Sequence, residues 1–164
     1  MGKFNGKISA EFTPPRTWIL EKSLSFETEH LNNDDIEILT QVGAKVEDTG
    51  KGTGKVTCGK GMKTDLASVP RAVWAFIAPW DVARAAIIHD LLYKRIRQYR
   101  KEHSKALKST EDSKVISEAK KASDDVFHMA MKDANPSVAG WKIAAAYYSV
   151  RMFGRWSIIP RDGD

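Results

Sequence analysis

A histidine and an aspartate stand side by side in the stretch AAIIHDLLYKR, residues 85–95. Apolar residues recur around the pair at three- and four-residue spacing, which predicts a helix with one buried face. This apolar stripe consists of Val82, Ala85, Ala86, Leu92, Tyr93 and Ile96. His89 falls in the middle of the stripe, where a polar group needs a hydrogen-bonding partner. His89 is therefore either a satisfied core histidine or part of a functional site.

Neighbouring polar residues favour the functional site. Tyr93 lies one helical turn after His89 on the same face, whereas Asp90 is turned by about 100° toward the edge of the helix. A second predicted helix contains SDDVFHMAM, in which Asp124 borders the apolar stripe. If the two helices pack antiparallel, we expect Asp124 to reach both His89 and Tyr93 across their interface.

Such a cluster has the groups that ester hydrolysis needs. An imidazole held by Asp124 is fixed in one tautomer and made more basic, so its other nitrogen can take a proton from water. Asp90 offers hard oxygen ligands to a cation such as Ca²⁺, which would stabilise the oxyanion formed when that water attacks an ester. This chemistry requires no nucleophile from the protein.

The same residues carry a resemblance to a known enzyme family. HDLLY is similar to the H-D-x-x-Y helix motif of secreted and parvoviral phospholipases A₂, and SDDVF is close to the A-D-x-x-F motif of the viral branch. The resemblance implies that His89 is the base, Asp90 the calcium ligand, Asp124 the dyad partner and Tyr93 the phenol bonded to that partner. The chain departs from the family because it has no glycine-rich calcium loop upstream of the motif. It also lacks the cysteines that staple the secreted enzymes.

The segment KTDLASVPRAVW stands where that calcium loop would lie. It is either a turn, in which Asp65 and Ser68 cap backbone groups, or part of the site. In a site, Asp65 would be a second metal ligand, and Arg71 would bind phosphate with Ser68 beside the substrate. His128, one turn after Asp124, either borders the substrate cleft or lies on the surface.

Four segments in a fixed order carry a wider resemblance. They are TDLASVPRAVW, RAAIIHDLLY, DDVFHMAM and YYSVRMFG, within residues 60–154. On these segments the chain is identified as a member of the phage and prophage family of domain of unknown function 1353. The resemblance implies a bacteriophage or prophage origin and a place in the virion, such as the tail, or in the host cytoplasm.

Two functions from different classes follow. The first is a calcium-assisted, phospholipase A₂-like hydrolase of lipids or esters that acts as the phage infects or lyses its host. The second is a virion structural or assembly protein, in contact with other virion proteins or with its own copies in a ring. In that protein the buried His-Asp-Tyr cluster only locks the helices together. An open cleft would favour the first function, and a closed, fully hydrogen-bonded cluster would favour the second.

These residues require a helical scaffold, and the sequence predicts one α+β domain. An antiparallel β portion is expected over residues 1–64, a loop over 65–79, a three-helix bundle over 80–154 and a tail over 155–164. Period-two alternation predicts strands in residues 18–28 and 36–46, separated by a turn at 32–35. The third helix is expected to begin at Asn135 and Pro136 and to end before Gly154. Its predicted inward stripe is Val138, Trp141, Ala145, Tyr148 and Met152.

The formal charge of +5 is concentrated after residue 64, much of it in YKRIRQYRK at residues 93–101. A basic face here either binds an anionic partner or is merely solvated. Anionic phospholipid is one such partner. Nucleic acid, bound through Lys94, Arg95, Arg97, Arg100 and Lys101, is the less favoured one. No stretch approaches the roughly 20 apolar residues of a membrane span, so none is expected. The lone Cys58 excludes an intramolecular disulfide and a cysteine-based metal cluster.

Overall fold

The structure is a computed structural model that describes residues 1–14, 16–50, 52–65, 79–103, 110–134 and 137–161. Its strands are β1 Lys3–Phe4, β2 Ala10–Thr13, β3 Thr17–Leu20, β4 Leu24–Thr28, β5 Val46–Asp48, β6 Gly54–Cys58 and β7 Lys63–Thr64. Its helices are α1 Asn33–Gln41, α3 Pro79–Glu102, α4 Thr110–Lys132 and α5 Gly140–Ser157. The predicted α+β class is therefore confirmed.

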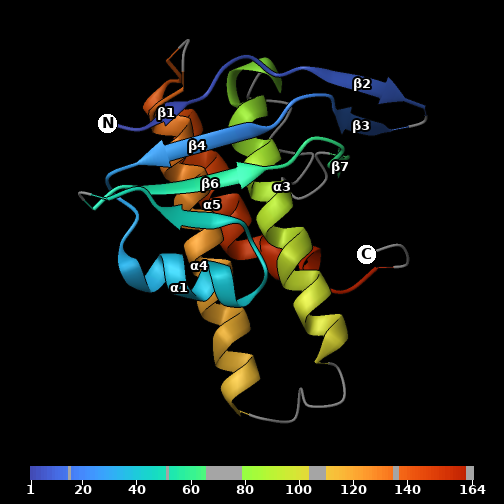
Figure 1. Cartoon of the computed structure of the whole chain (residues 1–164), viewed down its shortest axis with the longest axis vertical. Coiled ribbons are helices and arrows are strands. Elements are labelled where there is room, and N and C mark those ends of the chain that lie inside the picture. Colours follow the sequence, from blue (N-terminus) through green and yellow to red (C-terminus); the bar gives the residue numbers. More distant parts are fainter. Residues whose placement is uncertain (15, 51, 66–78, 104–109, 135–136, 162–164) are drawn as a thin grey trace.

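The strands form two antiparallel sheets. The first has the order β1-β4-β6-β5 and the second the order β2-β3-β7. Figure 1 shows the four-stranded sheet lying across α3 and α4, with α1 beside β5. β7 brings Thr64 against α3, so the smaller sheet also contacts the helix that carries His89 and Asp90.

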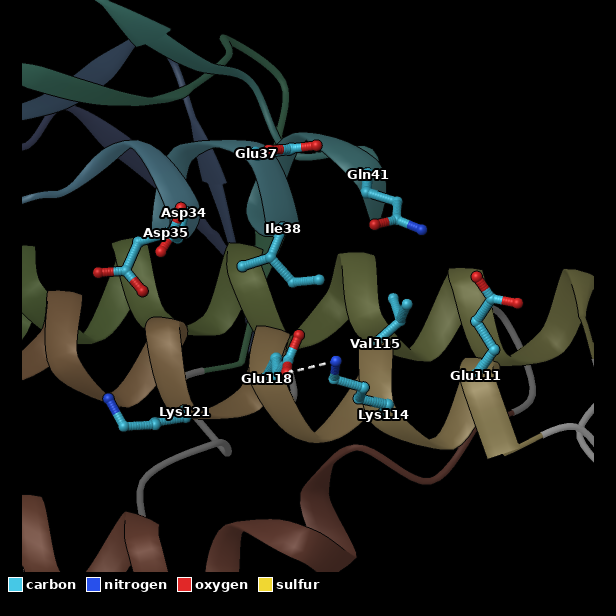
Figure 2. A pocket seen from close by; sticks show the side chains of 10 residues that line it. All are labelled: Asp34, Asp35, Glu37, Ile38, Gln41, Glu111, Lys114, Val115, Glu118 and Lys121. Carbon is cyan, nitrogen blue, oxygen red and sulfur yellow. Dashed lines mark ion pairs between the residues drawn. The ribbon is translucent and has the colours of Figure 1, made fainter.

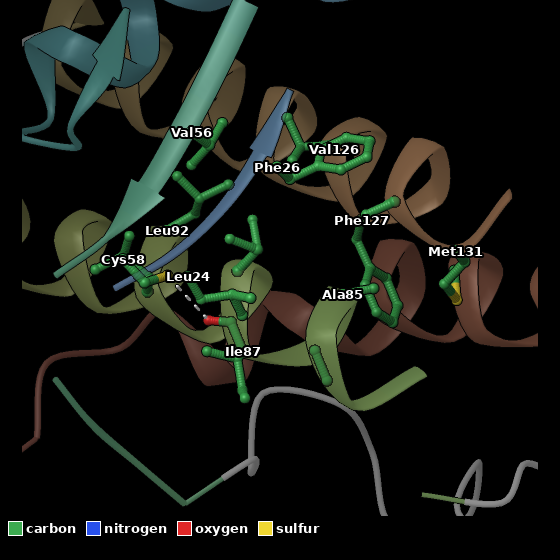
Figure 3. Close-up of a cluster of buried hydrophobic side chains, with 14 of the residues drawn as sticks. Leu24, Phe26, Val56, Cys58, Ala85, Ile87, Leu92, Val126, Phe127 and Met131 are labelled. Carbon is green, nitrogen blue, oxygen red and sulfur yellow. Dashed lines mark hydrogen bonds between the residues drawn. The ribbon is translucent and has the colours of Figure 1, made fainter. Parts of the chain in front are cut away.

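The main core lies between the four-stranded sheet and the helices. Phe26 of β4 and Val56 of β6 are buried with Leu92 of α3 and Phe127 of α4 in one apolar cluster (Figure 3). Cys58 at the end of β6 is fully buried, with its sulfur 3.9 Å from the carbonyl oxygen of Ile87. α3 contacts both the sheet and α4, and its polar residues His89 and Asp90 are buried there.

The predicted second strand at residues 36–46 is wrong over most of its length. Residues 33–41 form α1, and the strand β5 begins only at Val46. The predicted turn at residues 32–35 is the start of this helix, because the Asn32 side chain accepts a hydrogen bond from the Asp35 backbone N–H at 2.7 Å. Leu39 and Val42 are buried at helical spacing from Ile36. Ile36 and Val42 fit both the period-two pattern and the helical pattern, whereas Leu39 fits only the helical one.

The predicted three-helix bundle is also corrected, because residues expected to form a strand form the helix α1. The described residues contain four helices, and α1 belongs to the predicted β portion, where it packs against α4. The predicted bounds of the helical portion also change, since α3 begins at Pro79 and α5 continues through residues 155–157 of the predicted tail. Most of the predicted loop 65–79 lies outside the described residues. Among the described helices, none is long and apolar enough to cross a bilayer.

α5 also buries a different face from the one predicted. Its buried residues are Ile143, Ala146, Val150 and Gly154, whereas Trp141, Tyr148 and Met152 are exposed. The predicted start at Asn135 and Pro136 lies outside the described residues, and the helix begins at Gly140. Gly154 lies within α5 and not after its end. A Cβ atom at this position would overlap the Tyr93 hydroxyl group, so the position requires glycine. Its role is close packing rather than helix termination.

Candidate active site

The buried polar cluster is built on α3 and α4, which run antiparallel to each other (Figure 1). His89 and Tyr93 lie one turn apart on α3 and face Asp124 on α4. The His89 Nε2 atom is 3.0 Å from Asp124 Oδ1, and the Tyr93 hydroxyl group donates to the same oxygen at 2.6 Å. The contact predicted between these three side chains is therefore present.

The second carboxylate oxygen of Asp124, Oδ2, accepts hydrogen bonds from two cationic side chains. Lys120 Nζ donates to Oδ2 at 2.8 Å and also to the carbonyl oxygen of Val150 at 3.0 Å. Arg151 Nη1, on α5, donates to the same Oδ2 at 3.1 Å. Asp124 thus joins α3, α4 and α5 through four side-chain donors.

These contacts keep Asp124 ionised. Burial by itself would raise the pKa of Asp124, whose side chain is 0 % exposed. The hydrogen bond and charge of His89, followed by the hydrogen bonds of Lys120 and Tyr93, outweigh burial and lower that pKa to about 2. Burial and the nearby Asp124 charge raise the pKa of Tyr93 far above its ordinary value, so the phenol stays protonated and donates. Asp124 is therefore a carboxylate at neutral pH.

Aromatic rings fix the orientation of His89. The imidazole centroid lies 4.0 Å from the Tyr93 ring and 4.8 Å from the Phe127 ring. The His89 side chain is fully buried. The backbone of Gly154 on α5 covers the Tyr93 hydroxyl group. The ring is therefore held by packing as well as by Asp124.

Asp90 lies on a different side of α3. It is 5 % exposed, and the hydroxyl group of Thr64 on β7 donates to its Oδ2 atom. Asp65 follows Thr64 in the chain, but its half-exposed carboxylate pairs with Arg161 Nη1 at 3.9 Å. The predicted metal ligands thus have protein partners among the described residues.

Ca²⁺ takes six to eight oxygen ligands. The described residues contain no group of three or more His, Cys, Asp or Glu side chains that could hold a metal ion. On this side of α3 they provide the Asp90 carboxylate and the Thr64 hydroxyl group. These two groups do not fit a calcium site by themselves, so Ca²⁺ stays a prediction.

The predicted substrate-binding residues lie elsewhere or outside the described structure. Ser68 and Arg71 are outside the described residues. His128 stacks on the Tyr147 ring of α5 at 4.6 Å, and Tyr147 donates to Asp125 at 2.8 Å. Burial and the neighbouring Lys132 lower the pKa of His128. His128 therefore belongs to the α4–α5 contact beside the cluster.

In three of the clefts that described residues line, the lining contains none of His89, Asp90 and Asp124. The largest of them, about 460 Å³, lies between α1 and α4 (Figure 2). Its charged lining residues are Asp34, Asp35, Glu37, Glu111, Lys114, Glu118 and Lys121.

The basic run in α3 has a structural use. Arg97 Nη1 donates to the Ser157 carbonyl oxygen at 3.1 Å, and Arg100 Nη1 donates to the Ile158 carbonyl oxygen at 3.0 Å. These carbonyl groups are at the C-terminal end of α5, where the helix dipole favours cations. Two of the five cations expected to bind nucleic acid are therefore directed at the protein itself.

Comparison with known families gives one result. The model of a family described as "Protein of unknown function (DUF1353)" matches residues 41–150. The matched range contains His89, Asp90, Tyr93, Lys120 and Asp124, but stops one residue before Arg151. No curated protein and no solved structure matches the chain.

Proposed function

The chain belongs to the DUF1353 family, and we propose that it hydrolyses lipid or other ester bonds with His89 as the general base. One observation carries the proposal. A single oxygen of an ionised carboxylate, Asp124 Oδ1, is within hydrogen-bonding distance of both His89 Nε2 and the Tyr93 hydroxyl group. This arrangement supports a base whose tautomer and direction are fixed before substrate arrives.

The proton path follows from the hydrogen bonds. When Nε2–H of a neutral imidazole donates to Asp124, the basic lone pair is on Nδ1. Nδ1 takes a proton from the water that attacks the ester carbonyl carbon, and the carboxylate stabilises the imidazolium formed. Collapse of the tetrahedral intermediate breaks the bond to the alkoxide, which receives the proton back from Nδ1. The carboxylic acid and the alcohol are then released.

Lys120 and Arg151 have a defined part in this proposal. Both cationic side chains donate hydrogen bonds to Asp124 Oδ2, whereas His89 contacts the other carboxylate oxygen, Oδ1. Two cations on Oδ2 lower the proton affinity of the carboxylate, so the Nε2 proton of the imidazolium stays on His89 and does not move to Asp124. Because the His89 side chain is fully buried, turnover also requires a movement that admits water and ester.

Several features of the sequence-based hypothesis belong to the same proposal. They are a cation such as Ca²⁺ at Asp90, an anionic phospholipid substrate, and a bacteriophage or prophage protein that acts during infection or lysis, in the virion or the host cytoplasm. No chemical step above depends on the metal.

A second function is favoured by the closure of the cluster. His89, Tyr93 and Asp124 are all 0 % exposed, and Asp124 accepts from four side chains. A fully satisfied buried network specifies packing without chemistry. In this second proposal the protein is a virion structural or assembly component, in contact with other virion proteins or with its own copies in a ring.

The test is fatty-acid release from vesicles that contain phosphatidylglycerol, measured with Ca²⁺ and with a chelator. We expect release by the wild type and a loss of about 100-fold or more in His89→Gln. His103→Gln is the matched control, because His103 stacks on Tyr99 and hydrogen-bonds its carbonyl group, away from Asp124. This control should retain full activity.

No release by the folded wild type under either condition would contradict the hydrolase. A His89→Gln variant that then differs only in its unfolding free energy would support the structural proposal. Asp90→Asn tests the metal separately, since it should abolish a calcium dependence and leave the wild-type fold intact if Asp90 is a ligand.

A further inference from the structure

The outer face of α5 carries a row of large exposed side chains. Trp141, Tyr148 and Met152 are 62, 63 and 64 % exposed, respectively. Their spacing places them on one side of the helix, opposite the buried Ile143 and Val150. Monomeric soluble proteins rarely leave such a contiguous apolar surface uncovered.

The row continues into the last turn of α5 with Trp156 and just past its end with Ile159. Trp156 and Ile159 are 52 and 48 % exposed, and Phe153 flanks them on the same helix with 48 % exposure. The exposed row therefore extends over the full length of α5. We call Trp141, Tyr148, Met152, Trp156 and Ile159 the aromatic face.

The helix that carries the aromatic face, α5, has basic residues but no acidic ones. α5 contains Lys142, Arg151 and Arg155 but neither Asp nor Glu. The Arg155 guanidinium lies 4.4 Å from the centre of the Trp156 ring, and Lys142 Nζ lies 5.9 Å from the centre of the Trp141 ring. Arg151 is partly neutralised by Asp124. The positive charge of Arg155 thus lies directly beside an exposed tryptophan.

We propose that the aromatic face docks α5, parallel to the membrane plane, on the surface of an anionic phospholipid bilayer. Exposed Trp, Tyr and Met flanked by basic residues is the pattern of a helix that lies in the interface between headgroups and acyl chains. The rings enter the interface while Arg155 meets the lipid phosphates. α5 itself is not apolar enough to span a membrane.

The charge pattern favours this occupant over a second copy of the chain. Two aromatic faces packed against each other would bring the cations of both helices together without a carboxylate on either helix. That arrangement costs free energy in a protein dimer, whereas an anionic bilayer compensates each cation.

α5 is suited to bind as a rigid element. Its inner side is attached through the Arg151–Asp124 ion pair, the Gly154 contact with Tyr93 and the hydrogen bond from Arg97 to Ser157. The docking does not rest on the proposed hydrolysis, because the aromatic face consists of exposed side chains whereas His89 and Asp124 are fully buried.

Co-sedimentation with vesicles tests the proposal. The vesicles consist of diether phosphatidylglycerol with diether phosphatidylcholine, or of diether phosphatidylcholine alone. Ether-linked chains resist ester hydrolysis, so binding is measured whether or not the protein is an enzyme. The double variant Trp141→Ser/Met152→Ser removes two exposed side chains, and circular dichroism checks that it folds. Trp18→Ser is the matched control, because Trp18 is an exposed tryptophan on β3, outside α5.

We expect binding to the anionic vesicles that falls by more than about tenfold in the double variant and is unchanged in Trp18→Ser. Arg155→Glu should weaken binding to the anionic vesicles and leave binding to the neutral ones as it is. Lys45→Glu, an exposed lysine next to β5, is its control. Added salt should also weaken the anionic binding.

Three results would overturn the proposal. The first is a folded wild type that does not sediment with anionic vesicles. The second is binding that the double variant retains. The third is a concentration-dependent dimer that the double variant abolishes, without vesicle binding, which would assign the aromatic face to a second copy. Loss of hydrolysis in His89→Gln with intact vesicle binding would separate this proposal from the proposed function.

Discussion

The backbone of Gly154 on α5 lies so close to the phenol of Tyr93 on α3 that a Cβ atom at position 154 would come within 3.0 Å of Tyr93 Cζ and overlap its hydroxyl group. This contact seats α5 over the polar cluster, and it requires glycine.

We expect Gly154→Ala to lower the free energy of unfolding by about 1–3 kcal/mol, although alanine is the better helix former, because the packed core must shift to admit a methyl group. Gly140→Ala is the matched control, since nothing lies within 4 Å of a Cβ there. It should be neutral or slightly stabilising. Urea unfolding of both variants checks the prediction, and equal stabilities would contradict it.

Asp124→Asn is expected to be among the most destabilising conservative substitutions. It would leave Lys120 and Arg151 without their buried counter-charge, which should lower the unfolding free energy by about 3 kcal/mol. Asp125→Asn alters a more exposed ion pair with Lys121 and should cost about 1 kcal/mol or less. Chemical denaturation of both variants gives their unfolding free energies. A larger loss of stability in Asp125→Asn than in Asp124→Asn would contradict the role of Asp124 as the buried counter-charge.

Stability should fall in acid through Asp124. Its folded pKa of about 2 lies below the ordinary value of 3.8, so its contribution is fully present above about pH 4. Between about pH 4 and about pH 2 the unfolded chain binds the proton first, and about 2 kcal/mol of stability is lost. The difference between the wild type and Asp124→Asn should therefore shrink over this range. A difference that is independent of pH would show that the carboxylate is not the titrating group.

Arg97 should stabilise the end of α5. We expect Arg97→Gln to lower the unfolding free energy by about 1–3 kcal/mol and to speed hydrogen exchange in the last turn of α5, because the Ser157 carbonyl group loses a charged donor. Arg95→Gln removes an exposed cation that bonds Gln98 on its own helix and is the control. Unchanged exchange in the last turn would mean that other contacts hold this end.

The central contact of the site could be predicted from the sequence because it depends on two regular elements. His89 and Tyr93 are one turn apart on an apolar stripe, and Asp124 borders the stripe of the next helix. Antiparallel packing of consecutive helices then brings the three together. The roles proposed for these residues, and those for Asp90 and Asp65, stay predictions.

The cations on Asp124 were not predicted, for two different reasons. Lys120 stands four residues before Asp124 on the same helix, and this spacing is a readable signal for an ion pair. Arg151 reaches Asp124 from α5. Its approach depends on how a third helix packs, and no local spacing carries that information.

The errors in the fold have a common physical origin in apolar residues that fit two patterns. Ile36, Ile38 and Val42 alternate as in a strand, but the Asn32 cap and the position of Leu39 favour a helix. In α5 the bulky stripe was expected inside. The structure buries the smaller stripe, because Ala146 and Gly154 allow the helix axes to approach closely. Side-chain size, rather than hydrophobicity alone, selects the inner face.

Because Cys58 is buried between β6 and α3, its reaction with a thiol reagent can measure local opening of the protein. Burial of the β6 residue Cys58 against α3 raises the pKa of this thiol well above its ordinary range, and Asp90 raises it further. Alkylating reagents attack the thiolate, so the native chain should be inert toward them. Each labelling event then records a moment when β6 has separated from α3. The labelling rate of the chain's single cysteine reports the free energy of that separation without an added probe.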